Sequence, residues 1–137
     1  MKSKLSRGSF VALALSVATS SWAHHSVSGE FDITKHITFT GTVQKVEWTN
    51  PHVYTHVEVK QPDGGTVVYR IEGGAPNALF RQGWRKETLK LGDTVTVQGC
   101  RSKNPASTNI GMATLTAADG HPIYSDRSLD TSVGSAL

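Results

Sequence analysis

The sequence predicts an all-β domain, because three observations point to short strands rather than to long helices. Apolar and polar residues alternate with a period of two in several separate stretches, which is typical of half-buried strands. Clusters of glycine, proline, asparagine and aspartate separate these stretches and indicate turns. One short segment, residues 76–82, has the composition of a helix, so we expect little helical structure.

The first two predicted strands lie on either side of an Asn-Pro break. From Ile37 onward apolar residues alternate with threonines, and the alternation slips by one position before Val46, which indicates a bulge. Gly41 is expected to mark a bulge or a sharp bend, because it has no side chain to pack. Asn50-Pro51 ends this strand, and residues 52–59 form the next one.

A hairpin and a short helix are predicted to follow. Pro-Asp-Gly-Gly at residues 62–65 is a strong turn signal, so residues 66–72 should pair with the second strand. Residues 76–82 have proline near the first turn and Gly83 after the last, which is typical of a helix. Its Leu79 and Phe80 are expected to anchor it to the sheet.

Two further strands complete the predicted domain. Residues 93–99 alternate through valines, and residues 109–116 form the last strand. The core face of that last strand runs either through Ile110 and Met112 or through Leu115 on the opposite face.

Three strands, a short helix and two strands match the order of a five-stranded OB-like barrel with one short helix between strands three and four. The predicted organisation is a cleavable signal peptide at residues 1–23, an N-terminal arm at 24–36, the OB-like barrel at 37–118 and a polar tail at 119–137.

The predicted signal peptide has the three parts of a secretory leader. A basic start precedes an apolar stretch at residues 10–18, and the small residues Ser21 and Ala23 lie at the expected cut. The apolar stretch is shorter than the roughly 20 residues that a membrane span needs, and no later segment is long and apolar enough. We therefore expect a periplasmic or secreted protein whose mature form has no membrane span.

Charge and cysteine content narrow the function classes. The net charge of +3 comes from Lys2, Lys4 and Arg7 in the leader, which leaves eleven basic and eleven acidic residues after cleavage. Such a neutral chain lacks the basic surface of a nucleic-acid-binding protein. The one cysteine, Cys100, forms no internal disulfide and is expected to be buried.

Several motifs together resemble a family of small secreted bacterial domains of unknown function. The resemblance covers nearly the whole mature chain and implies an envelope location and a single β-rich domain, but no established activity. Where an aromatic residue is expected after the fourth strand's Val-x-Gly, this chain has Cys100. The motifs are Ala-His-His-Ser at 23–26, Gly-Thr-Val at 41–43, Glu-Trp-Thr-Asn-Pro-His-Val at 47–53, Gly-Trp-Arg-Lys at 83–86 and Gly-Asp-Thr-Val-Thr-Val at 92–97.

The two histidines at the predicted cleavage site are the most specific indication of function in the sequence. Cleavage after Ala23 leaves His24 as the mature N-terminus, where its imidazole and the free α-amine can chelate one metal ion, with His25 adjacent. Nitrogen ligands of this kind favour copper(II) among the divalent ions. The start resembles histidine-brace copper proteins in its terminal residue. The alternative to a metal site is a disordered N-terminus in which the two histidines have no ligand.

The second strand supplies further candidate ligands. His52, Tyr54, His56 and Glu58 share one face, opposite a face of valines and threonine that is expected to be the core side. The polar face is also what any exposed side of a sheet shows. Two other histidines, His36 and His121, are candidates to complete a metal site or are solvated loop residues.

Other groups of residues indicate alternative functions less specifically. Arg81, Trp84 and Arg85 are candidates to hold an anionic or planar ligand, unless Trp84 is a core residue. His121 and Tyr124 give a haem-binding alternative. No nucleophile elbow or phosphate loop is present, so catalysis has little support. The sequence thus predicts a periplasmic protein that binds copper through His24, His25, His52 and His56 for transfer or sequestration, or else a metal-free envelope module that binds a ligand or protein.

Overall fold

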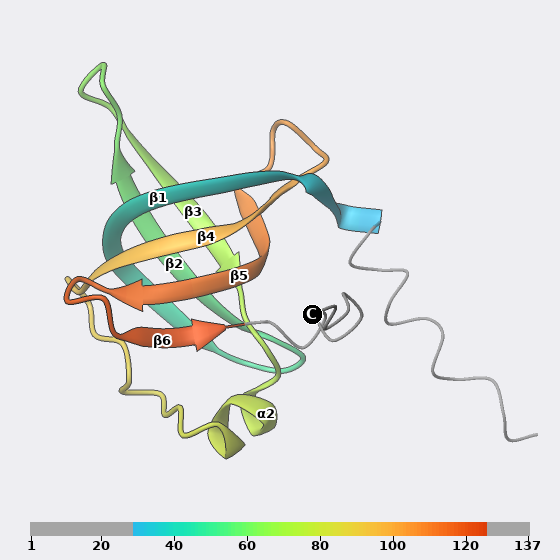
Figure 1. Cartoon of the computed structure of the whole chain (residues 1–137), viewed down its shortest axis with the longest axis vertical. Helices are drawn as coiled ribbons and strands as arrows, with labels where there is room; N and C mark the ends of the chain where they lie inside the picture. Colours follow the sequence, from blue (N-terminus) through green and yellow to red (C-terminus); the bar gives the residue numbers. More distant parts are fainter. Residues whose placement is uncertain (1–28, 126–137) are drawn as a thin grey trace, which may run out of the picture.

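The computed structural model describes residues 29–125, in which six strands form one sheet and helix α2 lies beside it (Figure 1). The strand order is β3-β2-β1-β4-β5-β6 with antiparallel neighbours, and β3 also pairs in parallel with β5. The predicted all-β class is therefore confirmed. The elements are β1 Phe31–Trp48, β2 Val53–Lys60, β3 Thr66–Glu72, α2 Pro76–Arg81, β4 Thr94–Ser102, β5 Asn109–Ala117 and β6 Pro122–Ser125.

Strand β1 is long and curved, because its two halves pair with different neighbours. Residues 31–42 pair with β4, and residues 42–48 pair with β2 (Figure 1). The register on β2 shifts between Val43 and Lys45, which confirms the predicted slip in alternation. At the bend, a Cβ on Gly41 would lie 2.6 Å from Cγ1 of Val57, so only glycine allows the two strands to approach this closely.

Both ends of the predicted domain are extended by strands that the sequence analysis assigns to the arm and the tail. Strand β1 begins at Phe31 rather than at Ile37, so the predicted arm at 24–36 is wrong over its last six residues. Phe31 is buried, while residues 33–36 are all exposed, which hides the alternation. Similarly, β6 lies within the predicted tail and pairs with β5.

The core lies on the valine face of β2, as predicted. Val53, Thr55 and Val57 are buried, while the residues between them are partly exposed. Strand β3 pairs with β2 along its whole length, which confirms the predicted hairpin. Buried side chains from β1, β4, β5 and the segment after α2 join the same cluster. The cluster consists of Val43, Val53, Val57, Ile71, Leu79, Trp84, Leu89, Val95, Val97, Ile110, Ala113 and Leu115.

Helix α2 ends where the sequence predicts, but only one of its two apolar anchors is buried. Its C-cap is Gln82, and Gly83 follows with a φ of 92°, a conformation that glycine adopts without strain. Leu79 is 1% exposed and packs in the core, whereas Phe80 is 56% exposed. The predicted anchoring role of Phe80 is therefore wrong, because adjacent helical residues point in different directions.

Strand β5 uses both of the faces that the sequence left open. Its register with β4 shifts between Gln98 and Cys100, and Met112 has a φ of 51°. This irregularity lets Ile110 and Leu115, five positions apart, both face the core. Within residues 29–125, no helix has the length and apolar character needed to cross a membrane.

Candidate functional site

The polar face of β2 carries three of the predicted site residues. Tyr54 and His56 alternate along β2, and His52 immediately precedes the strand, which begins at Val53 rather than at the predicted residue 52. All three are partly exposed and lie opposite the core face. The neighbouring strands add Glu47 from β1 and Arg70 from β3 to the same face, since Arg70 pairs with His56 in the sheet register. We call these residues, together with Lys45 and Glu72, the β2 polar face.

Each histidine on this face has its own carboxylate partner. His52 Nδ1 lies 2.8 Å from Glu72 Oε1, and His56 Nε2 lies 3.0 Å from Glu47 Oε1. Because a carboxylate only accepts hydrogen bonds, the imidazole nitrogen facing it carries the hydrogen. The opposite nitrogens, Nε2 of His52 and Nδ1 of His56, therefore hold the lone pairs when the rings are neutral, and neither makes a hydrogen bond within residues 29–125.

Cations are interleaved with these pairs. Lys45 Nζ lies 2.8 Å from Glu47 Oε1, and Arg70 Nη2 lies 3.9 Å from Glu47 Oε2. The Arg70 guanidinium carbon lies 3.4 Å from the centre of the Tyr54 ring, a cation–π contact. The hydrogen bond from Lys45 is the main cause that lowers the pKa of Glu47, with a smaller contribution from His56. Glu47 is therefore ionised at neutral pH, and its side chain is half-buried.

Tyr54 lies between the two histidines, and its pKa is affected by Glu30, near the first described residue. Burial is the main cause that raises the pKa of Tyr54, and the charges of Glu72 and Glu30 add to it. Glu30 is fixed nearby, since its Oε1 accepts a hydrogen bond from Asn109 Nδ2 at 3.0 Å and its carbonyl accepts one from the Lys103 backbone N–H. Asn109 is in turn the register partner of Arg70. The chain thus enters the sheet beside the β2 polar face.

The structure does not gather these residues into a ready metal site. Among residues 29–125, no group of three or more His, Cys, Asp or Glu side chains is arranged to hold a metal ion. His52 and His56 lie on one face but contact different carboxylates. The two histidines at the predicted cut, His24 and His25, lie outside the described residues, as does the predicted signal peptide at residues 1–23.

The residues that follow α2 are occupied by local contacts. Arg85 Nη1 donates to the carbonyls of Phe80 and Trp84, at 3.0 and 2.7 Å, and its guanidinium stacks on the Phe80 ring. Trp84 is 6% exposed and donates its indole N–H to the Ile123 carbonyl, so it is the core residue that the sequence left as an alternative. Arg81 is exposed in the last turn of the helix.

The remaining histidines lie apart from the β2 polar face. His36 Nδ1 is 3.6 Å from the Sγ of Cys100, which is buried as predicted, and burial raises the pKa of this thiol. His121 ends the turn of the β5–β6 hairpin, directly before β6, and its backbone N–H donates to Asp119 Oδ1. The side chain of Tyr124, the second residue of the haem alternative, lies outside the described part of the chain.

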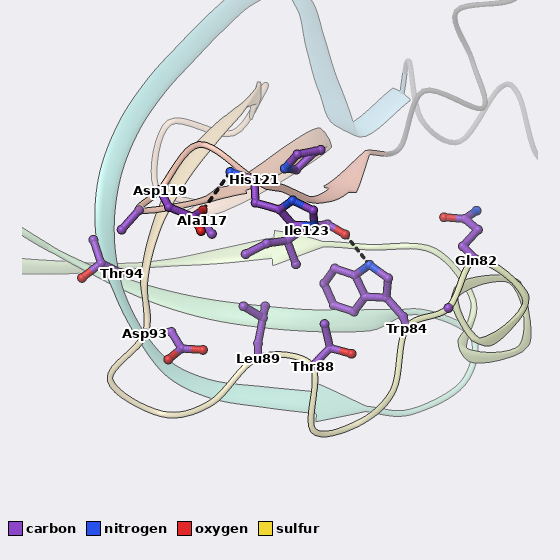
Figure 2. Close-up of a pocket in the computed structure, with 13 residues that line it drawn as sticks. Gln82, Trp84, Thr88, Leu89, Asp93, Thr94, Ala117, Asp119, His121 and Ile123 are labelled. Carbon is purple, nitrogen blue, oxygen red and sulfur yellow. Dashed lines mark hydrogen bonds between the residues drawn. The ribbon is translucent and has the colours of Figure 1, made fainter.

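A cavity of about 640 Å³ that the sequence analysis missed lies between the α2–β4 connection and the β5–β6 hairpin (Figure 2). No motif marks it, because its walls come from two loops whose turn signals, Gly92-Asp93 and Asp119-Gly120, indicate only a change of chain direction. Its most prominent side chains are Trp84, Leu89, Asp93, Asp119, His121 and Ile123.

These features define an all-β protein with a mostly antiparallel sheet, a polar histidine face and a separate loop-walled cavity. The chain matches DUF6152, a family of unknown function, over residues 12–111, and so belongs to that family. This confirms the resemblance to a family of unknown function that the motifs indicate. No curated protein matches the chain, and no solved structure matches it.

Proposed function

We propose that this chain is a periplasmic protein that binds copper through His24 and His25, with His52 or His56 as a further ligand, for transfer or sequestration rather than turnover. The leader supports export, because a basic start, an apolar stretch and small residues precede Ala23. Cleavage there makes His24 the terminal residue, so that one amine and one imidazole chelate the same ion. Copper(II) is the divalent ion that such nitrogen ligands bind best.

The observation that carries this proposal is the pairing of His52 with Glu72. A histidine that ligates a metal commonly donates its other ring N–H to a carboxylate, which fixes the ring and raises the basicity of the ligating nitrogen. His52 has this arrangement, with Nδ1 on Glu72 and Nε2 without a hydrogen bond in the described part of the chain. His56 has the same arrangement with Glu47.

The short distance along the chain from the cut to the sheet supports the same site. His25 precedes Glu30 by five residues, which span about 17 Å when extended. Glu30 is close enough to Tyr54 to raise its pKa, and alternate residues on a strand are roughly 7 Å apart. His52, the next residue on that face, therefore lies within reach of the terminal histidines.

An OB-like barrel is the fold we propose for the first five strands. Within this set of five, each strand pairs with two others, because β3 pairs with β5 and β1 pairs with both β2 and β4. That connectivity, with a short helix between β3 and β4, is the one expected of an OB-fold. In such folds the β2–β3 face binds ligands, and here it carries the β2 polar face.

The test begins with export of the protein through its own leader and intact-mass measurement of the mature N-terminus. Copper(II) affinity is then measured by competition with a calibrated chelator, for the mature protein and for the same chain with one methionine before His24. We expect one stoichiometric site that the extra methionine weakens sharply, since it removes the chelate of amine and imidazole. Equal affinity of the two forms, or a cut elsewhere than after Ala23, contradicts the proposal.

Variants on the sheet test the further ligand. His52→Gln is expected to weaken copper binding, and Glu72→Gln, which removes the orienting carboxylate, to weaken it about 10- to 100-fold. His121→Gln is the matched control, because His121 is another exposed histidine on a different hairpin. If His52→Gln, His56→Gln and His121→Gln all leave the affinity unchanged, the sheet contributes no ligand and the metal is held by the N-terminus alone.

A further inference from the structure

The cavity beside Trp84 is a second candidate site, built from elements that the β2 polar face does not use. One wall is the α2–β4 connection, residues 82–93, and the other is the β5–β6 hairpin (Figure 2). Its volume of about 640 Å³ falls within the range of roughly 300–1,000 Å³ that is usual for small-molecule sites. The space is large enough for a small organic molecule with an apolar part.

Apolar side chains form the inner part of this cavity and are held rigidly. Trp84 and Leu89 are buried members of the core cluster, and Ile123 packs against that cluster. The hydrogen bond from the indole N–H of Trp84 to the Ile123 carbonyl joins the two walls, as Figure 2 shows by its dashed line. Because its N–H is engaged, Trp84 contributes apolar surface to the cavity wall rather than a hydrogen-bond donor.

The acidic groups of the cavity are Asp93 and Asp119, and the imidazole of His121 also lines it. Asp93 Oδ2 accepts the Lys90 backbone N–H at 2.9 Å, and Asp119 Oδ1 accepts the His121 backbone N–H at 2.9 Å. Within residues 29–125 the second oxygen of each carboxylate accepts no hydrogen bond, and no lysine or arginine lines the cavity. Figure 2 shows both carboxylates toward one end and Trp84 toward the other.

We propose that this cavity binds a small organic cation, an ammonium group carried on an apolar body. The ammonium lies at Asp93 and Asp119, where each carboxylate offers an acceptor, and the charge assists the hydrogen bonds. The apolar body extends toward the other end of the cavity and packs against Trp84 and Leu89. The proposal is independent of copper, because neither the terminal histidines nor the β2 polar face contributes to it.

Other ligand classes fit the cavity less well. An anion would meet two carboxylates without an opposing lysine or arginine. A neutral apolar molecule would remove water from Asp93 and Asp119 without replacing their hydrogen bonds, which costs free energy. A metal ion would lack ligands, since no metal-holding group of His, Cys, Asp and Glu exists among the described residues.

The proposal is tested with three probes of similar shape and different charge: 2-phenylethylamine, 2-phenylethanol and 3-phenylpropanoate. Each is titrated into metal-free mature protein, with the indole N–H signal of Trp84 followed by NMR. We expect the amine to shift this signal with a saturable curve and to bind more tightly than the alcohol, and the anion to bind least. If the three probes bind equally, or if none shifts the Trp84 signal, the proposal is wrong.

A double variant and a matched control separate the effect of the carboxylate charges on binding from the effect of altered turns. Asp93→Asn with Asp119→Asn keeps an oxygen for each turn hydrogen bond but removes both charges. We expect this double variant to weaken amine binding about tenfold or more while leaving alcohol binding unchanged. Asp63→Asn is the matched control, because Asp63 makes the same kind of turn bond, to the Gly65 backbone N–H, in the β2–β3 hairpin. An equal loss in both variants, or no loss in the double variant, overturns the proposed role of the carboxylates.

Discussion

The packing of Phe31 against β5 is tested by the substitution Gly111→Ala. A Cβ at Gly111 would lie 2.5, 2.6 and 2.7 Å from Cε2, Cδ2 and Cζ of the buried Phe31 ring. These distances are shorter than real carbon contacts, so the ring or the strand must move. Phe31 begins β1, directly after Glu30, so this contact also fixes where the chain enters the sheet.

The expected loss of stability follows from two opposing contributions. Overpacking a well-packed site costs about 1–3 kcal/mol, while replacing glycine by alanine lowers the entropy of the unfolded chain and returns about 0.4–1 kcal/mol. The net loss is then about 1–2 kcal/mol. For a domain of this size, each kcal/mol lowers the Tm by roughly 4–8 °C.

Urea and thermal unfolding of the protein measure this loss. Gly29→Ala is the matched control, because a Cβ at Gly29 meets no atom within 4 Å. Combining Gly111→Ala with Phe31→Leu should recover part of the loss, since leucine vacates the space of the ring edge. A Gly111→Ala protein within about 0.5 kcal/mol of the unsubstituted protein would refute the packing argument.

Two further predictions concern the β2 polar face and helix α2. The pKa of Glu47 is lowered in the folded protein from its ordinary value of 4.5, so ionised Glu47 stabilises the fold above that pH. This stabilisation is lost as the pH falls through the pKa of Glu47 in the folded protein. Glu47→Gln should therefore be less stable than the unsubstituted protein at neutral pH but not in acid. Urea midpoints over a pH series check this, and a difference that is constant with pH contradicts it. Leu79→Ala should cost about 2–5 kcal/mol, whereas Phe80→Ala should cost no more than about 1 kcal/mol, from lost stacking with Arg85. Equal losses in the two variants, measured by urea unfolding, would contradict the burial assigned to α2.

The strands that the sequence predicts well are those with several buried residues at regular spacing. The valine face of β2 identifies both the strand and its core side, and the slip before Val46 reveals the bulge in β1. The start of β1 and the whole of β6 lack this signal. Phe31 is one buried residue followed by eleven exposed or half-buried ones, and β6 is four residues long, so the start of β1 and β6 lack a run of regularly spaced buried residues.

The candidate site is predictable only in part, because sequence specifies a strand face more directly than the neighbours of that face. The alternate spacing of His52, Tyr54 and His56 places Tyr54 and His56 on one face of β2, with His52 directly before the strand. The partners Glu47 and Glu72 come from β1 and β3, and their contacts depend on a register set by a bulge and a hairpin. The cavity beside Trp84 depends on the packing of two loops and has no periodic signal at all.

The charges around the two histidines favour His52 as the ligand that completes the proposed copper site. His56 shares Glu47 with Lys45, and Arg70 lies 3.9 Å from the same carboxylate, so two cations surround that pair and repel a further one. The carboxylate that holds His52, Glu72, adds a negative charge near Tyr54, and the side chain of His52 is 41% exposed against 21% for His56. A cation that approaches from the side of Glu30 therefore meets the negative charges of Glu30 and Glu72 first. It then meets the imidazole of His52, which Glu72 already orients.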